Sequence, residues 1–170
     1  GPVGCALTQI CPEFFHDGET EWGRKINFGQ PQVRDYFTDC ALHWLDAYHF
    51  DGLRFDSIHT LDDGSQPLIT ADLARRIRSR RPDAHLVAED SDHVTHLFEP
   101  GSGLYDARWD DDYHHALHVL LTGETFGYYN DFRHAPVSDL ALSLRDGQAL
   151  QGQPRPGQDK PVGSPSAHLP

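Results

Sequence analysis

Several kinds of residue are scarce in this sequence, and each shortage disfavours a class of protein. The 170 residues include no methionine and only three cysteines, Cys5, Cys11 and Cys40, without CxxC spacing. An odd number of unpatterned cysteines predicts free thiols in a reducing compartment, not a disulfide framework or a zinc site. Lysine and arginine total 14 against 26 aspartates and glutamates, which leaves a net charge of -12. Nucleic acid is therefore not an expected partner, because binding phosphates requires clustered basic residues.

Long apolar runs are also missing. No run approaches the roughly 20 residues that span a bilayer, and no basic region followed by an apolar stretch opens the chain. We therefore expect no membrane partner and no signal peptide, and we place the protein in the cytoplasm. The opening GPVGC and the lack of methionine suggest a segment of a longer product. What the sequence does contain, 38% hydrophobic and 11% aromatic residues, is enough for a packed core.

Helices and strands alternate in the predicted pattern of the first 150 residues. Apolar residues recur with helical spacing in four segments, 33–48, 68–80, 111–122 and 136–145. Short apolar runs predict buried strands over 53–56, 85–89 and 104–108. Strands that alternate with helices form parallel sheets, so the predicted fold class is α/β. Residues 151–170 are rich in glycine and proline, which predicts a long loop.

Two of the predicted strands end in a carboxylate. Asp56 follows GLRF, and Glu89 follows HLVA. The carboxyl ends of parallel strands form the active-site rim of α/β folds. If the two strands are neighbours, their spacing of about 4.8 Å brings the carboxyl groups near the roughly 5 to 5.5 Å separation of a retaining glycosidase. The pattern therefore indicates a pair of carboxylates suited to double displacement.

The residues around the two carboxylates predict different roles for them. Side chains alternate along a strand, so Arg54 shares a face with Asp56 and favours its ionised form, which a nucleophile needs. Glu89 follows the apolar residues Val87 and Ala88, and desolvation there raises its pKa, which a general acid needs. The alternative interpretation is a simple Arg54 to Asp56 ion pair at a strand end, with Glu89 as a solvated loop residue.

Longer strings of the sequence resemble the α-amylase superfamily, glycoside hydrolase family 13. DGLRFDSIH is similar to the segment that carries its nucleophile, and LVAED is similar to the segment that carries its acid/base. EWGRKINF and VRDYFTDCALHWLDAYHFDGLRFD extend the resemblance, also toward glycogen branching enzymes. The most discriminating string, WDDDYHHALHVLLTGETFGYY, resembles the trehalohydrolases that act on maltooligosyl trehalose.

The resemblance implies that residues 1–150 are the central part of a catalytic (β/α)8 barrel, about strands 3 to 6, incomplete in this chain. It implies Asp56 as the nucleophile, Glu89 as the acid/base and Arg54 as the arginine two places before the nucleophile. His59 would contact sugar hydroxyls, and further substrate-binding candidates are Asp90, Trp22, Trp109, Asp110 and Asp111. The implied substrate is an α-glucan oligosaccharide, with no cofactor and no metal.

Two motifs of the superfamily are not found in this sequence. One ends in Asn-His after an early strand, and the other is the later Asn-His-Asp motif, which supplies a third carboxylate. A complete barrel has about 250 residues, so we expect the isolated chain to be inactive. Residues 151–170 would then lead toward the remainder of the barrel.

Three other interpretations are left open. A branching transferase of the same superfamily would use a sugar hydroxyl in place of water as the acceptor. A metal-dependent hydrolase is the alternative from another class, because His114 and His118 lie one helical turn apart after Asp110, Asp111 and Asp112. No HExxH glutamate accompanies them, and His115 and His118 are expected to be ordinary helix residues. A non-catalytic remnant that binds glucan is the third, and the sequence does not indicate the oligomeric state.

Overall fold

The structure, a computed structural model, describes residues 6–20, 23–61 and 64–166. It divides into two compact units, one made of residues 1–53 and 60–84 and the other of 54–59 and 85–170. The boundary falls inside strand β3, Gly52–Phe55, so the residues that follow this strand belong to the second unit. Among the described residues, none of the helices combines the length and the apolarity needed to cross a membrane.

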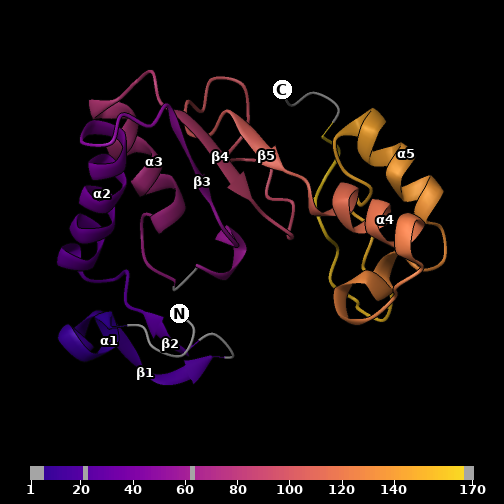
Figure 1. Ribbon diagram of the computed structural model, residues 1–170, viewed down its shortest axis with the longest axis horizontal. Helices are drawn as coiled ribbons and strands as arrows, with labels where there is room; N and C mark the ends of the chain where they lie inside the picture. The colour runs from indigo at the N-terminus through magenta and orange to yellow at the C-terminus, as the bar shows by residue number, and fades with distance from the viewer. Residues whose placement is uncertain (1–5, 21–22, 62–63, 167–170) are drawn as a thin grey trace. The chain divides into compact units, whose positions relative to one another are not determined.

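Two long helices form the centre of the first unit. Helix α2, Pro31–Asp46, and helix α3, Ile69–Arg80, lie side by side (Figure 1). Val33 and Leu45 in α2 and Ala74 and Ile77 in α3 are fully buried, whereas Tyr36 and Trp44 of α2 are exposed. Both predicted helices are confirmed, although α2 ends before Tyr48. The backbone of His49 is left-handed, with φ of 57°, a conformation that a right-handed helix cannot continue.

A buried arginine ties the loops of the first unit to its helices. Arg34 is 7% exposed, and its Nε donates to the carbonyl of Phe28 at 2.6 Å. Its Nη1 pairs with the Asp72 carboxylate at 2.8 Å, and its Nη2 donates to Ser65 and to the carbonyl of Pro67. A buried guanidinium needs hydrogen-bond partners for its N–H groups. Here the partners come from the segment before α2 and from the segment around the start of α3.

The N-terminal elements were not predicted from the sequence. Helix α1, Leu7–Ile10, and the short 3-10 helix η1, Pro12–Phe14, precede a two-stranded antiparallel sheet of β1, Phe15–Thr20, and β2, Gly23–Ile26. The strands are polar and lack a regular apolar alternation, so nothing in their pattern indicates pairing. Cys11 and Cys40 are free thiols, as expected, and Cys5 lies outside the described residues.

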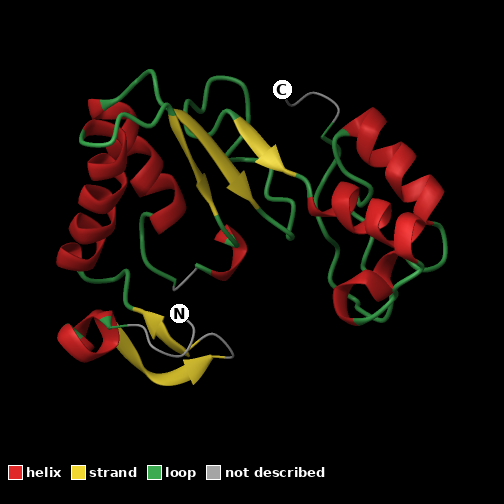
Figure 2. Ribbon diagram, in the orientation of Figure 1, coloured by secondary structure: helices red, strands yellow, loops and turns green. Residues whose placement is uncertain are grey.

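A sheet in the order β3-β4-β5 organises the second unit. Strand β4, His85–Glu89, matches its predicted range, and it pairs in parallel with β5, Ala107–Trp109. The three arrows point the same way (Figure 2), and the predicted parallel α/β sheet is confirmed. The third strand begins later than its apolar run. Leu104 and Tyr105 are buried in the loop before β5. An apolar run predicts that its residues are buried, but it does not predict whether they pair with a neighbouring strand.

The rest of the second unit is helical and then irregular. Helix α4, Asp111–Thr122, packs against helix α5, Pro136–Asp146, and against the 3-10 helix η3, Gly127–Phe132 (Figure 1). The side chains at their contact are Ala116, Val119 and Phe132. Both helices confirm the prediction. The described residues after α5 contain one isolated bridge, between Pro154 and Pro161.

Replacing Gly147 by alanine is expected to destabilise the chain by about 1 kcal/mol. Gly147 caps the C-terminus of α5 with φ of 82°, a left-handed conformation that a Cβ disfavours. No neighbouring atom lies within 4 Å of an added Cβ, so the cost is conformational only. Urea unfolding followed by circular dichroism measures it. Gly147→Asn is the matched control and should cost less, because asparagine tolerates this region; equal losses would contradict the explanation.

Candidate active site

The predicted catalytic residues lie together at the carboxyl ends of the parallel strands. Asp56 directly follows β3, Glu89 is the last residue of β4, and Trp109, the last residue of β5, lies opposite Glu89 in the register. Arg54 Nη1 is 2.6 Å from Asp56 Oδ1, and its Nη2 is 3.7 Å from Glu89 Oε2. One guanidinium therefore contacts both carboxylates, which brings them to one point of the rim.

The two carboxylates have different surroundings. The side chain of Asp56 is 75% exposed and that of Glu89 only 12%. Burial raises the pKa of Glu89, and the hydrogen bond and negative charge of Asp111 and the charge of Asp56 raise it further. The backbone N–H of Ser57 donates to Glu89 Oε2 and opposes this rise in pKa. Glu89 thus holds a proton to higher pH than an ordinary glutamate, while Asp56 lies in water beside a cation.

Ser57 is a residue that the sequence analysis missed. Its backbone is left-handed, with φ of 49°, an uncommon conformation for a residue with a side chain. This conformation accompanies the contact between its N–H and Glu89, which lies 32 positions further along the chain. Strained residues that aim a backbone group at a functional side chain are typical of active sites. In the sequence, the feature that could have indicated this role is the position of Ser57 directly after Asp56.

Trp109 offers an aromatic surface beside the carboxylates. It is 50% exposed, and the Arg54 guanidinium lies 5.0 Å from the centre of one of its rings. A half-exposed indole has the flat apolar surface that a sugar ring can stack on, and the arginine orients it. Trp22, the other predicted aromatic candidate, lies outside the described residues.

His59 lies in the 3-10 helix η2, Ile58–Thr60, which follows β3, and Asp90 lies directly after β4. His59 Nδ1 accepts a hydrogen bond from the Ser91 N–H at 3.3 Å and lies 3.9 Å from Asp90 Oδ1. Asp90 is fully buried, and its carboxylate accepts from the N–H groups of Asp92 and Val94. These contacts favour a supporting role for Asp90, because its oxygens are occupied by the turn that follows β4. His59 remains partly exposed and available to a ligand.

Asp110 and Asp111 are the N-terminal residues of α4. Asp110 is the N-cap, and its side chain accepts from the N–H of Asp112 at 3.2 Å. Burial, together with the charge of Asp112, raises the pKa of Asp110 to about 6. Asp111 is 3% exposed and accepts a hydrogen bond from the Ser91 hydroxyl. Both residues therefore stabilise the helix start, where carboxylates are favourable, and Asp111 also connects this helix to Glu89.

A buried histidine–aspartate pair, also missed from the sequence, lies behind this helix start. His93 Nε2 is 3.0 Å from Asp112 Oδ2, and both side chains are fully buried. The same oxygen of Asp112 accepts from the N–H groups of Ala149 and Leu150. The pair joins the loop after β4 to the segment after α5, and it thereby fixes the start of α4 under the rim.

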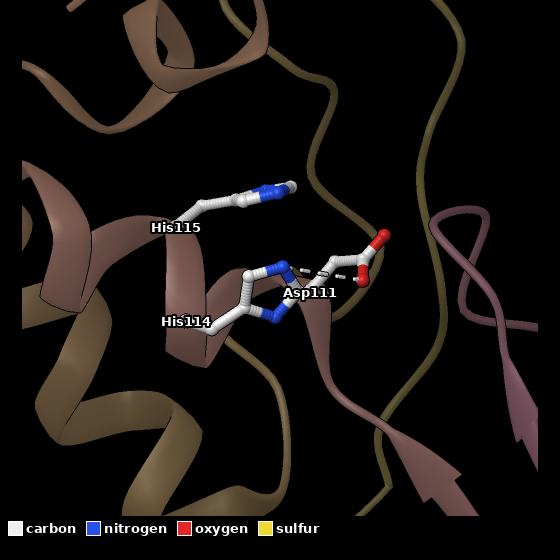
Figure 3. Close-up of side chains that lie close together, drawn as sticks. All are labelled: Asp111, His114 and His115. Carbon is white, nitrogen blue, oxygen red and sulfur yellow. Dashed lines mark ion pairs between the residues drawn. The ribbon is translucent and has the colours of Figure 1, made fainter.

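The pair of histidines predicted as a metal-binding motif does not form a ligand group among the described residues. His118 Nε2 is 2.9 Å from Glu124 Oε2, and its ring stacks on Tyr129 at 4.0 Å. Ligand atoms close enough to share a metal ion occur instead in two other groups, Asp111 with His114 and His115, and His93 with Asp110 and Asp112. Figure 3 shows the first of these, at the start of α4.

Comparison with known proteins identifies the family. No protein-family model matches the chain. The malto-oligosyltrehalose trehalohydrolase of Deinococcus radiodurans is 36% identical over 154 residues, which are 90% of this chain and 25% of that protein. The enzyme of the same name from Saccharolobus solfataricus is 33% identical over 86% of this chain and 26% of its own length. A crystal structure of a Salmonella typhimurium protein, provisionally described as an α-amylase, covers 98% of this chain and 30% of its own, with a TM-score of 0.86 and 41% identity.

The chain belongs to the α-amylase superfamily. The predicted fold, part of a (β/α)8 barrel, is thereby confirmed. The chain spans about a quarter of the length of the curated relatives it matches. A 1,4-α-glucan branching enzyme of Marinobacter nauticus is also similar, at 27% identity over 82% of this chain.

Proposed function

We propose that this α-amylase superfamily chain contributes the nucleophile and the acid/base of a retaining glycoside hydrolase, acting as part of a longer protein. The substrate would be maltooligosyl trehalose, cleaved at the α-1,4-glucosidic linkage next to its trehalose end, with release of trehalose. The observation that carries the proposal is the Arg54 guanidinium, which contacts an exposed Asp56 and a largely covered Glu89 together. The names of the relatives that match 90% and 86% of the chain support the choice of substrate.

The chemistry would proceed in two displacements. The Asp56 carboxylate attacks the anomeric carbon, and Glu89 donates its proton to the glycosidic oxygen, so that trehalose leaves and a maltooligosyl ester of Asp56 forms. Glu89, now a carboxylate, takes a proton from water, and this water attacks the same carbon and breaks the ester. The product keeps the α configuration, and Glu89 regains its proton.

The neighbouring residues would position the substrate and the two carboxylates. Arg54 keeps Asp56 charged and oriented through the 2.6 Å contact. The half-exposed ring of Trp109 would stack on a sugar ring, and His59 would contact sugar hydroxyls. Asp90, Asp110 and Asp111 would hold the loops and the helix start in place, because each carboxylate accepts at least one hydrogen bond from a protein group.

A product analysis tests the reaction type. The full-length protein that contains this chain is incubated with maltooligosyl trehalose, and the products are separated by chromatography. We expect two products, free trehalose and a malto-oligosaccharide. NMR during the reaction should detect the α anomer of the malto-oligosaccharide first, because a retaining enzyme keeps the α configuration. New α-1,6 branches would identify a transferase instead, an alternative that the 27% identical branching enzyme supports. Failure of the full-length protein to turn over any α-glucan would indicate a non-catalytic relative. The isolated 170-residue chain is expected to be inactive.

Replacing Glu89 by glutamine in the full-length protein is expected to lower kcat by about 10² to 10⁴-fold. The first displacement requires protonated Glu89, whose pKa is raised by burial. In the pH range where Asp56 is ionised, activity of the unchanged enzyme should therefore be full below the pKa of Glu89 and fall as pH rises through it. The variant should lose that decline. The measurement is kcat as a function of pH.

Exposed Glu99 provides the matched control for Glu89, because Glu99→Gln makes the same chemical change away from the rim. A substrate whose leaving group needs no proton, such as an aryl α-maltooligoside, should recover much of the first step in Glu89→Gln. An unchanged pH profile in Glu89→Gln would contradict the assignment of the acid/base.

A further inference from the structure

Helix α4 places three metal-ligating side chains on one face. Asp111 lies three residues before His114 and four before His115, so the histidines stand one turn above the carboxylate. One ligand atom from each of the three lies within 4.8 Å of the others. Figure 3 shows the His114 ring beside the Asp111 carboxylate and the His115 ring on the same side of the helix.

One oxygen of Asp111 accepts no hydrogen bond from an N–H or hydroxyl group of the described residues, although Glu89, when protonated, can donate to this carboxylate. The residue is 3% exposed, and its Oδ2 accepts from the Ser91 hydroxyl. Its Oδ1 is buried and unsatisfied, and it lies 3.8 Å from His114 Nε2. Burying a carboxylate oxygen without a partner is costly, and a bound cation at this oxygen would remove the cost.

The two histidines are held by contacts that leave ring nitrogens for a ligand. His114 Nδ1 is 3.1 Å from the carbonyl of Asp110, and because a carbonyl only accepts, this nitrogen carries the hydrogen. The lone pair of the neutral ring is then on Nε2, the atom that faces Asp111. The His115 ring is held by stacking on Tyr128, with ring centres 4.6 Å apart, and by an edge contact with Tyr129.

We propose that Asp111, His114 and His115 form a binding site for a divalent transition metal of the Zn²⁺ class. Two imidazoles and one carboxylate are a common ligand set for such ions, with water in the remaining positions. Ligands of a tetrahedral Zn²⁺ lie about 3.4 Å apart, so binding requires only side-chain rotations from the present positions. The N-terminus of a helix repels cations, and the neighbouring Asp110 and Asp112 offset this effect.

The site is tested by titrating the chain with ZnCl₂ in an isothermal calorimeter. Cysteine thiolates bind zinc tightly, so Cys5, Cys11 and Cys40 are first replaced by serine. We expect one ion bound at this site, and both Asp111→Asn and His114→Gln should weaken its binding by at least about tenfold. The matched control is His118→Gln on the same helix, which should leave the affinity unchanged, because His118 is paired with Glu124.

Two results would overturn the proposal. One is the absence of zinc binding by the cysteine-free chain, and the other is an unchanged affinity in both Asp111→Asn and His114→Gln. Circular dichroism shows whether each variant is folded. The side chain of His114 is 42% exposed, so His114→Gln decides the question even if the change at Asp111 disturbs α4. The readout is binding alone, so its outcome does not depend on whether the full-length protein hydrolyses a glucan.

Discussion

Turnover by the full-length protein should fall at least about a thousandfold when Asp56 is replaced by asparagine, because the variant cannot form the covalent ester. Substrate affinity should change little, since an amide has nearly the shape of the carboxylate. Asp56 is 75% exposed in its side chain, so the fold should tolerate the change. Trehalose release measures kcat, and calorimetry with maltooligosyl trehalose measures the dissociation constant.

The control for this experiment is Asp159→Asn, the same substitution at an exposed position of the C-terminal loop. It should leave both kcat and affinity unchanged. Near-normal turnover by Asp56→Asn would rule out Asp56 as the nucleophile. A loss of affinity as large as the loss of kcat would instead point to a role in binding.

Replacing Asp112 by alanine is expected to cost about 3 to 5 kcal/mol of the free energy of unfolding. The change leaves His93 buried without its partner and removes the acceptor for the N–H groups of Ala149 and Leu150. Total stabilities of single domains are about 5 to 15 kcal/mol, so the variant should be close to unfolding. Urea denaturation of the chain measures the loss. A double change of His93 and Asp112 to leucine should cost less than Asp112→Ala alone, since no buried polar side chain is then left without its partner.

The pH dependence of this stability has a definite sign. Burial acts to raise the pKa of Asp112, but the hydrogen bond and charge of His93 and the N–H of Leu150 hold it below its ordinary value. A depressed pKa adds stability that is fully present above the unfolded-state pKa of about 3.9 and is lost as pH falls through the folded-state value. Acid should therefore destabilise the unchanged chain more than Asp112→Ala. An equal slope in both proteins would contradict this account.

Local patterns predicted some elements well and others poorly, for a physical reason. Strand β4 and helix α4 have the predicted bounds. Leu86 and Ala88 of β4 and Ala116 and Val119 of α4 are buried, whereas Leu120 and Leu121 near the end of α4 are exposed. The prediction failed at the β1 to β2 hairpin, whose strands are polar, and at the start of β5. Leu104 and Tyr105 are apolar because they pack under a loop, and their burial gave no information about strand pairing.

The candidate site shows the same division. The ends of two predicted strands pointed to Asp56 and Glu89, and alternation along a strand placed Arg54 beside Asp56. The contacts of Glu89 with Ser57 and with the charge of Asp111 were not predictable, because they join residues far apart in the chain. The burial of Asp90 beneath the turn that follows β4 could not be predicted either. Its carboxylate accepts hydrogen bonds from the N–H groups of Asp92 and Val94, which depend on how that turn folds.

The sequence by itself determined the α/β class, the order of its main helices and strands, and the two carboxylates at strand ends, since periodicity and strand ends are local properties. Only the tertiary structure decided that one guanidinium touches both carboxylates, that Glu89 is largely covered while Asp56 is in water, and that His93 is paired with Asp112. These facts depend on strand order, register and loop packing. A linear pattern contains none of them, because each is set by contacts between residues that only folding brings together.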